Sequence, residues 1–299
     1  MKNNLRVGVV GNIYKKEIIK IINTFLELLN INKIEFLLSD NLIDKRSELV
    51  KNYSLDKFCS IKEMSEKTDL VVSFGGDGTM LSSAYELRGS ETPMLGINLG
   101  KLGFLAEYDL DSVSELVKEI KEQKFIIDER MALTGYNVND RSEELYGIND
   151  IVIEKGKWPK MIELTIKVDN DYVTTFSADG LIIATPTGST GYSLSTGGPI
   201  VNPKIKAITL CPISPHTLTM RPLVLSSKQK IEVEVRSSVE KVQVNCDGQR
   251  VYYYDTPVTL EIVKSDKPIR LVHSNKTNYF EILRNKLFWG LDVRKNNMK

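Results

Sequence analysis

The first third of the chain carries apolar segments of two kinds in alternation. Short continuous apolar runs predict buried strands at residues 6–10, 34–38, 69–74 and 94–98. Apolar residues at helical spacing, or helix-compatible stretches between these runs, predict helices at residues 18–29, 79–87 and 112–123. Strands that alternate with helices are typical of a parallel, doubly wound sheet. We therefore predict a Rossmann-like α/β domain over residues 1–127.

From about residue 125 the apolar positions alternate with polar ones instead, most clearly over residues 162–168, 231–235 and 242–246. This alternation indicates strands with one buried face, and Asp247-Gly248 is typical of a two-residue hairpin turn. We predict an antiparallel, β-rich domain of β-sandwich type over residues 128–273. Residues 274–299 are polar and then apolar, and we expect this segment to pack back on the N-terminal domain.

Composition narrows the class of function. The chain has 299 residues, of which 41% are hydrophobic and 26% charged, as in soluble globular proteins. Its 40 Lys and Arg residues balance 39 Asp and Glu residues, which argues against nucleic acid as a partner. No apolar run could span a bilayer, and we identify no signal peptide. Three scattered cysteines and two histidines fit neither a disulfide framework nor a zinc site, so we expect a cytoplasmic protein.

A glycine-rich loop follows the predicted strand at residues 69–74. Gly75, Gly76, Gly78 and Thr79 surround Asp77. We expect the glycines to take positive φ and to let the backbone approach a phosphate, which the N–H groups of a helix start also favour. An aspartate in such a loop suits a magnesium ion or the proton of a substrate hydroxyl. The alternative is a tight turn in which Thr79 caps the helix.

Two polar segments interrupt the strand pattern of the second half. The run Thr185–Tyr192 combines hydroxyls and glycines, which can bind a nucleotide's polar edges, with a ring that can stack on its base. Asn149-Asp150 lies within an apolar pattern, where polar side chains need partners. An amide there can address a base edge and a carboxylate can accept two ribose hydroxyls. The alternatives are a surface loop for the first segment and a strand-end turn for the second.

These elements, in this order, resemble the NAD kinase family. Its GGDGT motif matches Gly75–Thr79, its pair of asparagine and an acidic residue matches Asn149-Asp150, and its TPTGSTAY motif matches Thr185–Tyr192. Gly191 stands where the family usually has alanine, and residues 99–105 also match. GGDGT is shared with diacylglycerol and sphingosine kinases and resembles phosphofructokinases, so the second motif is the specific one.

The resemblance implies transfer of a phosphoryl group from ATP, or another donor, to the 2′-hydroxyl of the adenosine ribose of NAD, giving NADP. It implies that Asp77 is the catalytic aspartate, that magnesium accompanies the triphosphate and could contact Asp77, and that the enzyme is a homodimer or homotetramer. It also implies an NAD site, in which Gly191 contributes backbone, formed by Asp77, Gly78, Asn149, Asp150, Lys160, Asp179, Thr187, Thr190, Gly191, Tyr192, Ser195 and Gln249.

Two other functions share parts of this pattern. A lipid kinase of the diacylglycerol class would use the same glycine loop, but the sequence shows no basic amphipathic helix or apolar loop with which to reach a bilayer. A sensor that binds NAD or NADPH without turnover would have little need for a carboxylate beside phosphates. The residue types at Asp77 and at Thr185–Tyr192 therefore favour the kinase.

Overall fold

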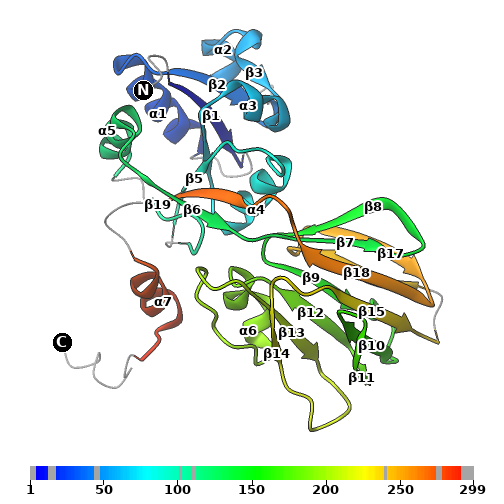
Figure 1. Cartoon of the computed structure of the whole chain (residues 1–299). Coiled ribbons are helices and arrows are strands. Elements are labelled where there is room, and N and C mark those ends of the chain that lie inside the picture. The colour runs from blue at the N-terminus through cyan, green and yellow to red at the C-terminus, as the bar shows by residue number, and fades with distance from the viewer. Residues whose placement is uncertain are drawn as a thin grey trace. The chain divides into compact units, whose positions relative to one another are not determined.

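The computed structural model describes residues 5–12, 18–43, 48–100, 103–108, 112–238, 241–273 and 278–290. The chain forms two compact units, shown with their elements in Figure 1. Unit 1 comprises residues 1–129 and 269–299, and unit 2 comprises residues 130–268. Residues 1–4, Lys101 and Leu102 of the motif at 99–105, and residues 274–277 and 291–299 of the C-terminal segment lie outside the described residues.

Unit 1 is built on a seven-stranded sheet in the order β3-β2-β1-β4-β5-β19-β6. Its strands are β1 (Arg6–Gly11), β2 (Glu35–Ser39), β3 (Phe58–Cys59), β4 (Leu70–Phe74), β5 (Met94–Ile97), β6 (Ile126–Arg130) and β19 (Ile269–His273). The pairs from β3 through β19 run parallel. The predicted parallel sheet is therefore confirmed. Its strand β19 follows unit 2 in the sequence.

Helices cover both faces of this sheet. The helices of unit 1 are α1 (Ile18–Ile31), η1 (Asp40–Leu42), α2 (Glu48–Asn52), η2 (Leu55–Lys57), α3 (Ile61–Lys67), α4 (Asp77–Glu86), α5 (Val113–Glu122) and α7 (Tyr279–Leu287), of which α1 and α3 lie on opposite faces of the sheet. On one face, Phe25 of α1 meets Phe74 edge-to-face at 5.2 Å between ring centroids. On the other face, Met64 of α3 fills the space above Gly8, so a side chain at Gly8 would clash. The apolar residues of α1, whose spacing predicted this helix, and those of α5 thus face the buried sheet.

Unit 2 is a sandwich of two six-stranded antiparallel sheets, as predicted. One has the order β11-β10-β15-β18-β7-β8 and the other β14-β13-β12-β9-β16-β17. The strands are β7 (Leu133–Asn137), β8 (Asp140–Gly147), β9 (Asp150–Glu154), β10 (Ile162–Val168), β11 (Asp171–Ala178), β12 (Gly180–Ala184), β13 (Ala207–Ile213), β14 (Leu223–Ser226), β15 (Ile231–Arg236), β16 (Lys241–Cys246), β17 (Arg250–Asp255) and β18 (Val258–Lys264).

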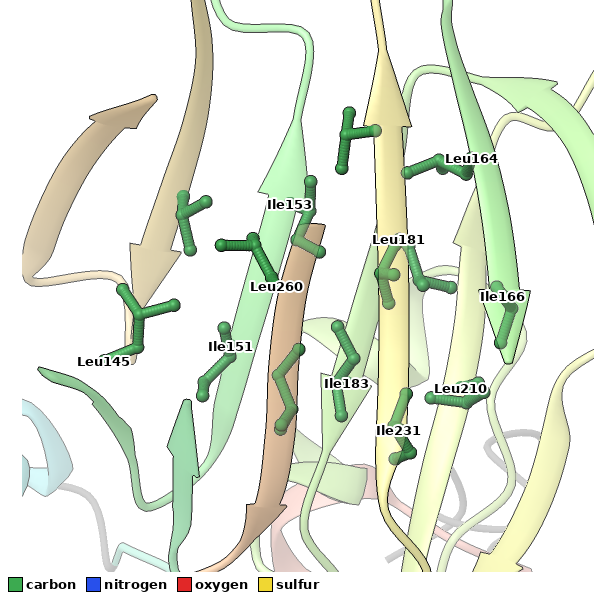
Figure 2. Packing of buried hydrophobic residues seen from close by; sticks show 14 of the residues in the cluster. Leu145, Ile151, Ile153, Leu164, Ile166, Leu181, Ile183, Leu210, Ile231 and Leu260 are labelled. Carbon is green, nitrogen blue, oxygen red and sulfur yellow. The ribbon is translucent and has the colours of Figure 1, made fainter. Parts of the chain in front are cut away.

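The alternating residues of these strands form one apolar core between the two sheets. Figure 2 shows Ile151, Ile153 and Leu181 of one sheet beside Leu164 and Leu260 of the other. The hairpin predicted at Asp247-Gly248 is present, with φ values of 56° and 68° that suit a tight two-residue turn between β16 and β17. None of the helices among the described residues is both long and apolar enough to cross a membrane.

Candidate active site

In unit 1 the glycine loop joins the end of β4 to the start of α4. Gly76 is the N-cap of α4 and provides no side-chain cap, and Asp77 is the first helical residue. Thr79 therefore does not cap this helix, and the alternative that assigned it that role is wrong. A helix N-terminus with no capping side chain is a position where backbone N–H groups suit an anion.

The carboxylate of Asp77 is fixed by the backbone of the segment that follows β5. The N–H groups of Leu105 and Ala106 donate to Oδ1 at 3.0 and 3.3 Å, and that of Phe104 donates to Oδ2 at 3.0 Å. The ammonium of Lys286 lies 3.5 Å from Oδ2. Since a carboxylate offers about four acceptor positions, these three amides fix its orientation, with two of them on Oδ1 and one on Oδ2.

The glycines next to Asp77 differ in how much space surrounds them. None of Gly75, Gly76 and Gly78 takes positive φ, so the expectation of left-handed backbone in this loop is wrong. A Cβ at Gly75 would overlap the side chain of Thr79, whereas one at Gly76 would meet nothing within 4 Å. The space beside the Cα atom of Gly75 is therefore filled, whereas the space beside the Cα atom of Gly76, at the helix N-terminus, is open.

Gly103 gives a direct test of how Asp77 is held. A Cβ at this position would collide with Asp77 Oδ1 and stand 3.2 Å from the backbone nitrogen of Ala106. We expect Gly103→Ala to push the carboxylate from its amides and to lower kcat at least tenfold, with little change in the melting temperature. Gly89→Ala, at a glycine with no neighbour within 4 Å and positive φ, is the control for a purely local backbone effect. Steady-state turnover that equals wild type would show that Asp77 does not need this geometry.

In unit 2 the two polar segments of the second half lie against each other. The Thr185 N–H donates to the Asn149 carbonyl at 2.8 Å, and the Thr185 hydroxyl donates to the Ile148 carbonyl at 2.6 Å. Gly188 also has no room for a side chain, because the Asn149 backbone fills that space. A Cβ at Gly191 would lie 3.8 Å from Asn149 Nδ2 and 3.9 Å from Asp150 Oδ2. The structure thus brings Asn149 and Asp150 beside Gly188–Gly191.

Asp247, in the turn between β16 and β17, holds the Asn149-Asp150 backbone in place. Its Oδ1 accepts N–H bonds from Ile148 at 2.8 Å, Asn149 at 2.7 Å and Asp150 at 3.3 Å. Its Oδ2 accepts a 2.7 Å bond from the guanidinium of Arg250. The Asp247 side chain is fully buried in this arrangement. We call these contacts the Asp247 clamp.

Asp150 lies in an electrostatically unfavourable position beside the Asp247 clamp. It is only 4% exposed, and its burial together with the charge of Asp247 raises its pKa to about 7. A carboxyl group with this pKa changes charge near neutral pH, which is uncommon for a structural aspartate and frequent at functional sites.

The remaining predicted residues of unit 2 occupy three places. Thr187, Thr190, Tyr192 and Ser195 lie on the short helices η3 (Gly188–Thr190) and α6 (Tyr192–Ser195) or directly before them. Gln249 is exposed in the β16–β17 turn. Asp179 precedes β12 and pairs with Lys155 at 2.6 Å, whereas Lys160 is exposed in the connection between β9 and β10. Asp77 and Gly78, by contrast, belong to unit 1.

Several hydroxyls of the Thr185–Thr196 run have structural partners. The buried Ser189 hydroxyl bonds to Pro186 and Val201, and the buried Ser193 hydroxyl lies 3.1 Å from the Cys211 sulfur. Ser195 donates to the Tyr192 carbonyl of its own helix. The Tyr192 ring, in contrast, is 44% exposed and is available to a ligand.

Comparison with known proteins places both units in one family. The family models for the ATP-NAD kinase N-terminal domain and C-terminal domain match residues 7–125 and 148–274. The NAD kinase of Chloroherpeton thalassium is 33% identical over 287 residues, which cover 96% of this chain and 98% of that protein. An NAD kinase of Pseudomonas aeruginosa is 36% identical over 95% of this chain and 96% of its own length. The chain belongs to the NAD kinase family.

Solved structures agree with this placement. An NAD kinase from Archaeoglobus fulgidus, crystallised in complex with ATP, superposes with a TM-score of 0.72 at 28% identity and covers 94% of this chain and 99% of its own. A yeast NADH kinase crystallised with NADH has the same fold, with a TM-score of 0.88 at 24% identity over 98% of this chain and 90% of its own. As a member of the NAD kinase family, the chain is a kinase.

The magnesium ion that the sequence resemblance implies has no cluster of protein ligands among the described residues. No group of three His, Cys, Asp or Glu side chains that could hold a metal ion occurs within the described part of the chain. Three of the acceptor positions of Asp77 already receive amide N–H bonds, and an ammonium faces Oδ2. These donors do not fit a magnesium ion held by Asp77, so we derive no step through such an ion.

Sequence reasoning missed several side chains that contact the predicted site residues, such as Arg130, which donates to the Thr187 hydroxyl at 3.5 Å. Asp247 was noted for its hairpin turn and not for its contacts, and Arg250 and Lys155 were not singled out. Lys286 lies more than two hundred positions after Asp77 along the chain. A charged residue directly after a buried strand, as at Lys155, is the one local signal that could have been used.

Proposed function

We propose that this chain transfers the γ-phosphoryl group of ATP to the 2′-hydroxyl of the adenosine ribose of NAD, giving NADP and ADP. The new bond joins the ribose oxygen to the γ-phosphorus. The bond from that phosphorus to the bridging oxygen breaks, and its electron pair leaves on ADP. The observation that best supports this is the Asp77 carboxylate, fixed by three backbone amides at a helix N-terminus that suits phosphate.

Asp77 takes the proton of the ribose hydroxyl in this proposal. A ribose hydroxyl is a poor nucleophile at neutral pH, and a positioned carboxylate typically contributes about 10²–10⁴-fold by accepting its proton. Oδ2 suits that role, because it accepts one amide bond where Oδ1 accepts two. Gly75, Gly76, Gly78 and Thr79 provide the surrounding phosphate loop.

Unit 2 supplies the NAD-binding residues. Asn149 and Asp150, held by the Asp247 clamp, address the base and the ribose hydroxyls, and Gly191 contributes backbone beside them. The exposed Tyr192 ring stacks on a base. Thr187, Thr190, Ser195, Asp179, Lys160 and Gln249 complete the proposed site.

A phosphate-transfer assay tests the function directly. The purified chain is given ATP and magnesium with NAD, with diacylglycerol in micelles, or with no acceptor. We expect NADP with NAD, no phosphatidic acid with the lipid, and only slow ATP hydrolysis without an acceptor. Lipid phosphate as the product would identify a lipid kinase, and nucleotide binding without any transfer would identify a sensor.

Tyr192 tests how NAD is bound. Stacking on a base is typically worth about 1–3 kcal/mol, so Tyr192→Ala should raise the Kd for NAD about ten- to a hundredfold. Tyr192→Phe keeps the ring and should bind NAD like wild type, and the Kd for ATP should be unchanged in both variants. Calorimetric titration gives these constants. A large fall in the melting temperature of Tyr192→Ala, with normal NAD binding by the folded fraction, would show that the ring serves packing.

Asp150 should make NAD binding depend on pH. The charged carboxylate accepts ribose hydroxyls, so the Kd for NAD should fall several-fold as pH rises from 6 to 8 through the pKa of about 7. The same raised pKa disfavours the charged form in the fold, so stability of the free protein decreases between pH 3.8 and 7, by up to about 4 kcal/mol. Asp150→Asn should bind NAD weakly at every pH and melt higher than wild type at pH 8. A pH dependence that survives in Asp150→Asn would assign the effect to another group and remove Asp150 from this role.

Magnesium enters, in this proposal, as the counter-ion of the triphosphate. We also propose a homodimer or homotetramer in the cytoplasm. The exposed Val251 and Tyr253 on the edge strand β17, 45% and 61% exposed, support self-association, and three cysteines without a disulfide suit a reducing compartment. Sedimentation analysis of wild type and of Tyr253→Lys measures the association.

A further inference from the structure

The C-terminal helix α7 carries a lysine to the Asp77 carboxylate. Lys286 Nζ lies 3.5 Å from Asp77 Oδ2 and 5.4 Å from the centre of the Phe104 ring. Phe104 is also the residue whose N–H donates to that same Oδ2. The ammonium therefore stands beside the carboxylate oxygen that the proposed mechanism uses.

The sequence of α7 explains why Lys286 points this way. The Asn278 side chain caps the helix by accepting the Glu281 N–H at 3.0 Å. Ile282 and Leu283 are buried, each 2% exposed. Lys286 follows them by four and three positions, so it shares their face of the helix and its side chain lies over the protein. Arg284, in contrast, is exposed.

A cation beside Asp77 would favour phosphoryl transfer. During transfer, negative charge is spread over the three equatorial oxygens of the phosphoryl group. Asp77 is itself negative and repels that group as the ribose oxygen approaches it. An ammonium has three donors and can engage a carboxylate oxygen and a phosphoryl oxygen together. Lys286 is about one-third exposed, so its remaining donors are accessible to a ligand.

We propose that Lys286 is a further catalytic residue, which binds the γ-phosphoryl group of ATP beside Asp77. This rests on the function proposed above. Before transfer the ammonium divides its contacts between Asp77 Oδ2 and a γ-phosphoryl oxygen. When Asp77 accepts the ribose proton it becomes neutral, and the attraction of Lys286 to the phosphoryl oxygens is then no longer offset. The ammonium of Lys286 thus binds the phosphoryl group most strongly in the transition state, while one phosphorus–oxygen bond forms and the other breaks. Stabilisation of the transition state raises kcat.

The test measures ATP binding where the Asp77 charge is already removed. Magnesium-ATP and magnesium-ADP are titrated calorimetrically into Asp77→Asn and into Asp77→Asn/Lys286→Gln. Charge-assisted bonds to phosphate are strong, so we expect the Kd for ATP to rise about ten- to a hundredfold in the double variant, and the Kd for ADP to change less than threefold. In the otherwise wild-type chain, Lys286→Gln should lower kcat, and Lys286→Arg should restore part of it. Arg284→Gln, on the exposed side of the same helix, is the matched control and should equal wild type in all assays.

Two results would overturn the assignment. Equal ATP affinity in the two variants would mean that Lys286 acts only by pairing with Asp77. An equal loss of ATP and ADP affinity would mean that the substitution disturbs the loop and not a γ-phosphoryl contact. Failure of the proposed function itself is seen separately, as absence of NADP from the wild-type chain, because the titrations need no turnover.

Discussion

Asp77→Asn is expected to lower kcat by about 10²–10⁴-fold, while the Kd for NAD stays within a few-fold of wild type. The amide cannot accept the ribose proton. Its NH₂ group would also face the Phe104 N–H or the Lys286 ammonium, so the side chain loses part of its fixed orientation. Single-turnover measurement of NADP formation separates this chemical step from product release.

The control for this loss is Glu66→Gln, which removes an exposed carboxylate of α3 in the same unit and should leave turnover unchanged. Calorimetric NAD binding and a thermal melt confirm that Asp77→Asn is folded. Near-normal kcat in a folded Asp77→Asn protein would remove Asp77 from the mechanism, whatever its contacts in the structure.

The second large effect concerns stability. Asp247→Ala removes the acceptor of three backbone N–H groups, two of them in buried bonds, and leaves the Arg250 guanidinium, 16% exposed, without this partner. Breaking a buried ion pair on one side typically costs about 3–5 kcal/mol, so we expect the melting temperature to fall by about 10 °C. Because the Asn149-Asp150 backbone loses its support, the KM for NAD should rise more than the KM for ATP.

Two further variants separate the ion pair from the rest of the clamp. Asp247→Ala/Arg250→Leu should be less unstable than the sum of its single changes, because the second change removes the charge that has lost its Asp247 partner. Asp255→Ala, at the far end of the same hairpin, breaks an exposed pair with Lys241 and should change stability by less than about 1 kcal/mol. A similar loss of stability in Asp247→Ala and Asp255→Ala would argue against the clamp.

Elements defined by local pattern could be predicted from the sequence. The buried runs at β1, β4 and β5, the apolar spacing of α1 and the Asp247-Gly248 turn each depend on a few neighbouring residues. Strands β6 and β19 were not predicted. β19 pairs with β5, although all of unit 2 lies between them in the sequence. A pattern read over a short stretch of sequence cannot reveal such a pairing.

Only some residues of the candidate site could be predicted from the sequence. The motif residues Asp77 and Asn149-Asp150 were found because their chemistry is unusual for their positions. Their partners could not be found, since backbone N–H groups such as those of Phe104–Ala106 have no sequence signature. Asp247 and Lys286 meet their partners only because distant segments fold together. The glycines show the same limit: their number was informative, but their steric role depended on neighbours such as Thr79.

The order of strands in unit 1 has a consequence for synthesis on the ribosome. Unit 2 is one continuous stretch, so it can fold as soon as residue 268 has emerged. Unit 1 begins the chain but must wait, because β19 fills a place between β5 and β6 and Val272 belongs to its core. The nascent sheet therefore has an open position next to β5 for as long as unit 2 is being made. Unit 1, although it begins the chain, is therefore the last to be completed, when α7 brings Lys286 to Asp77.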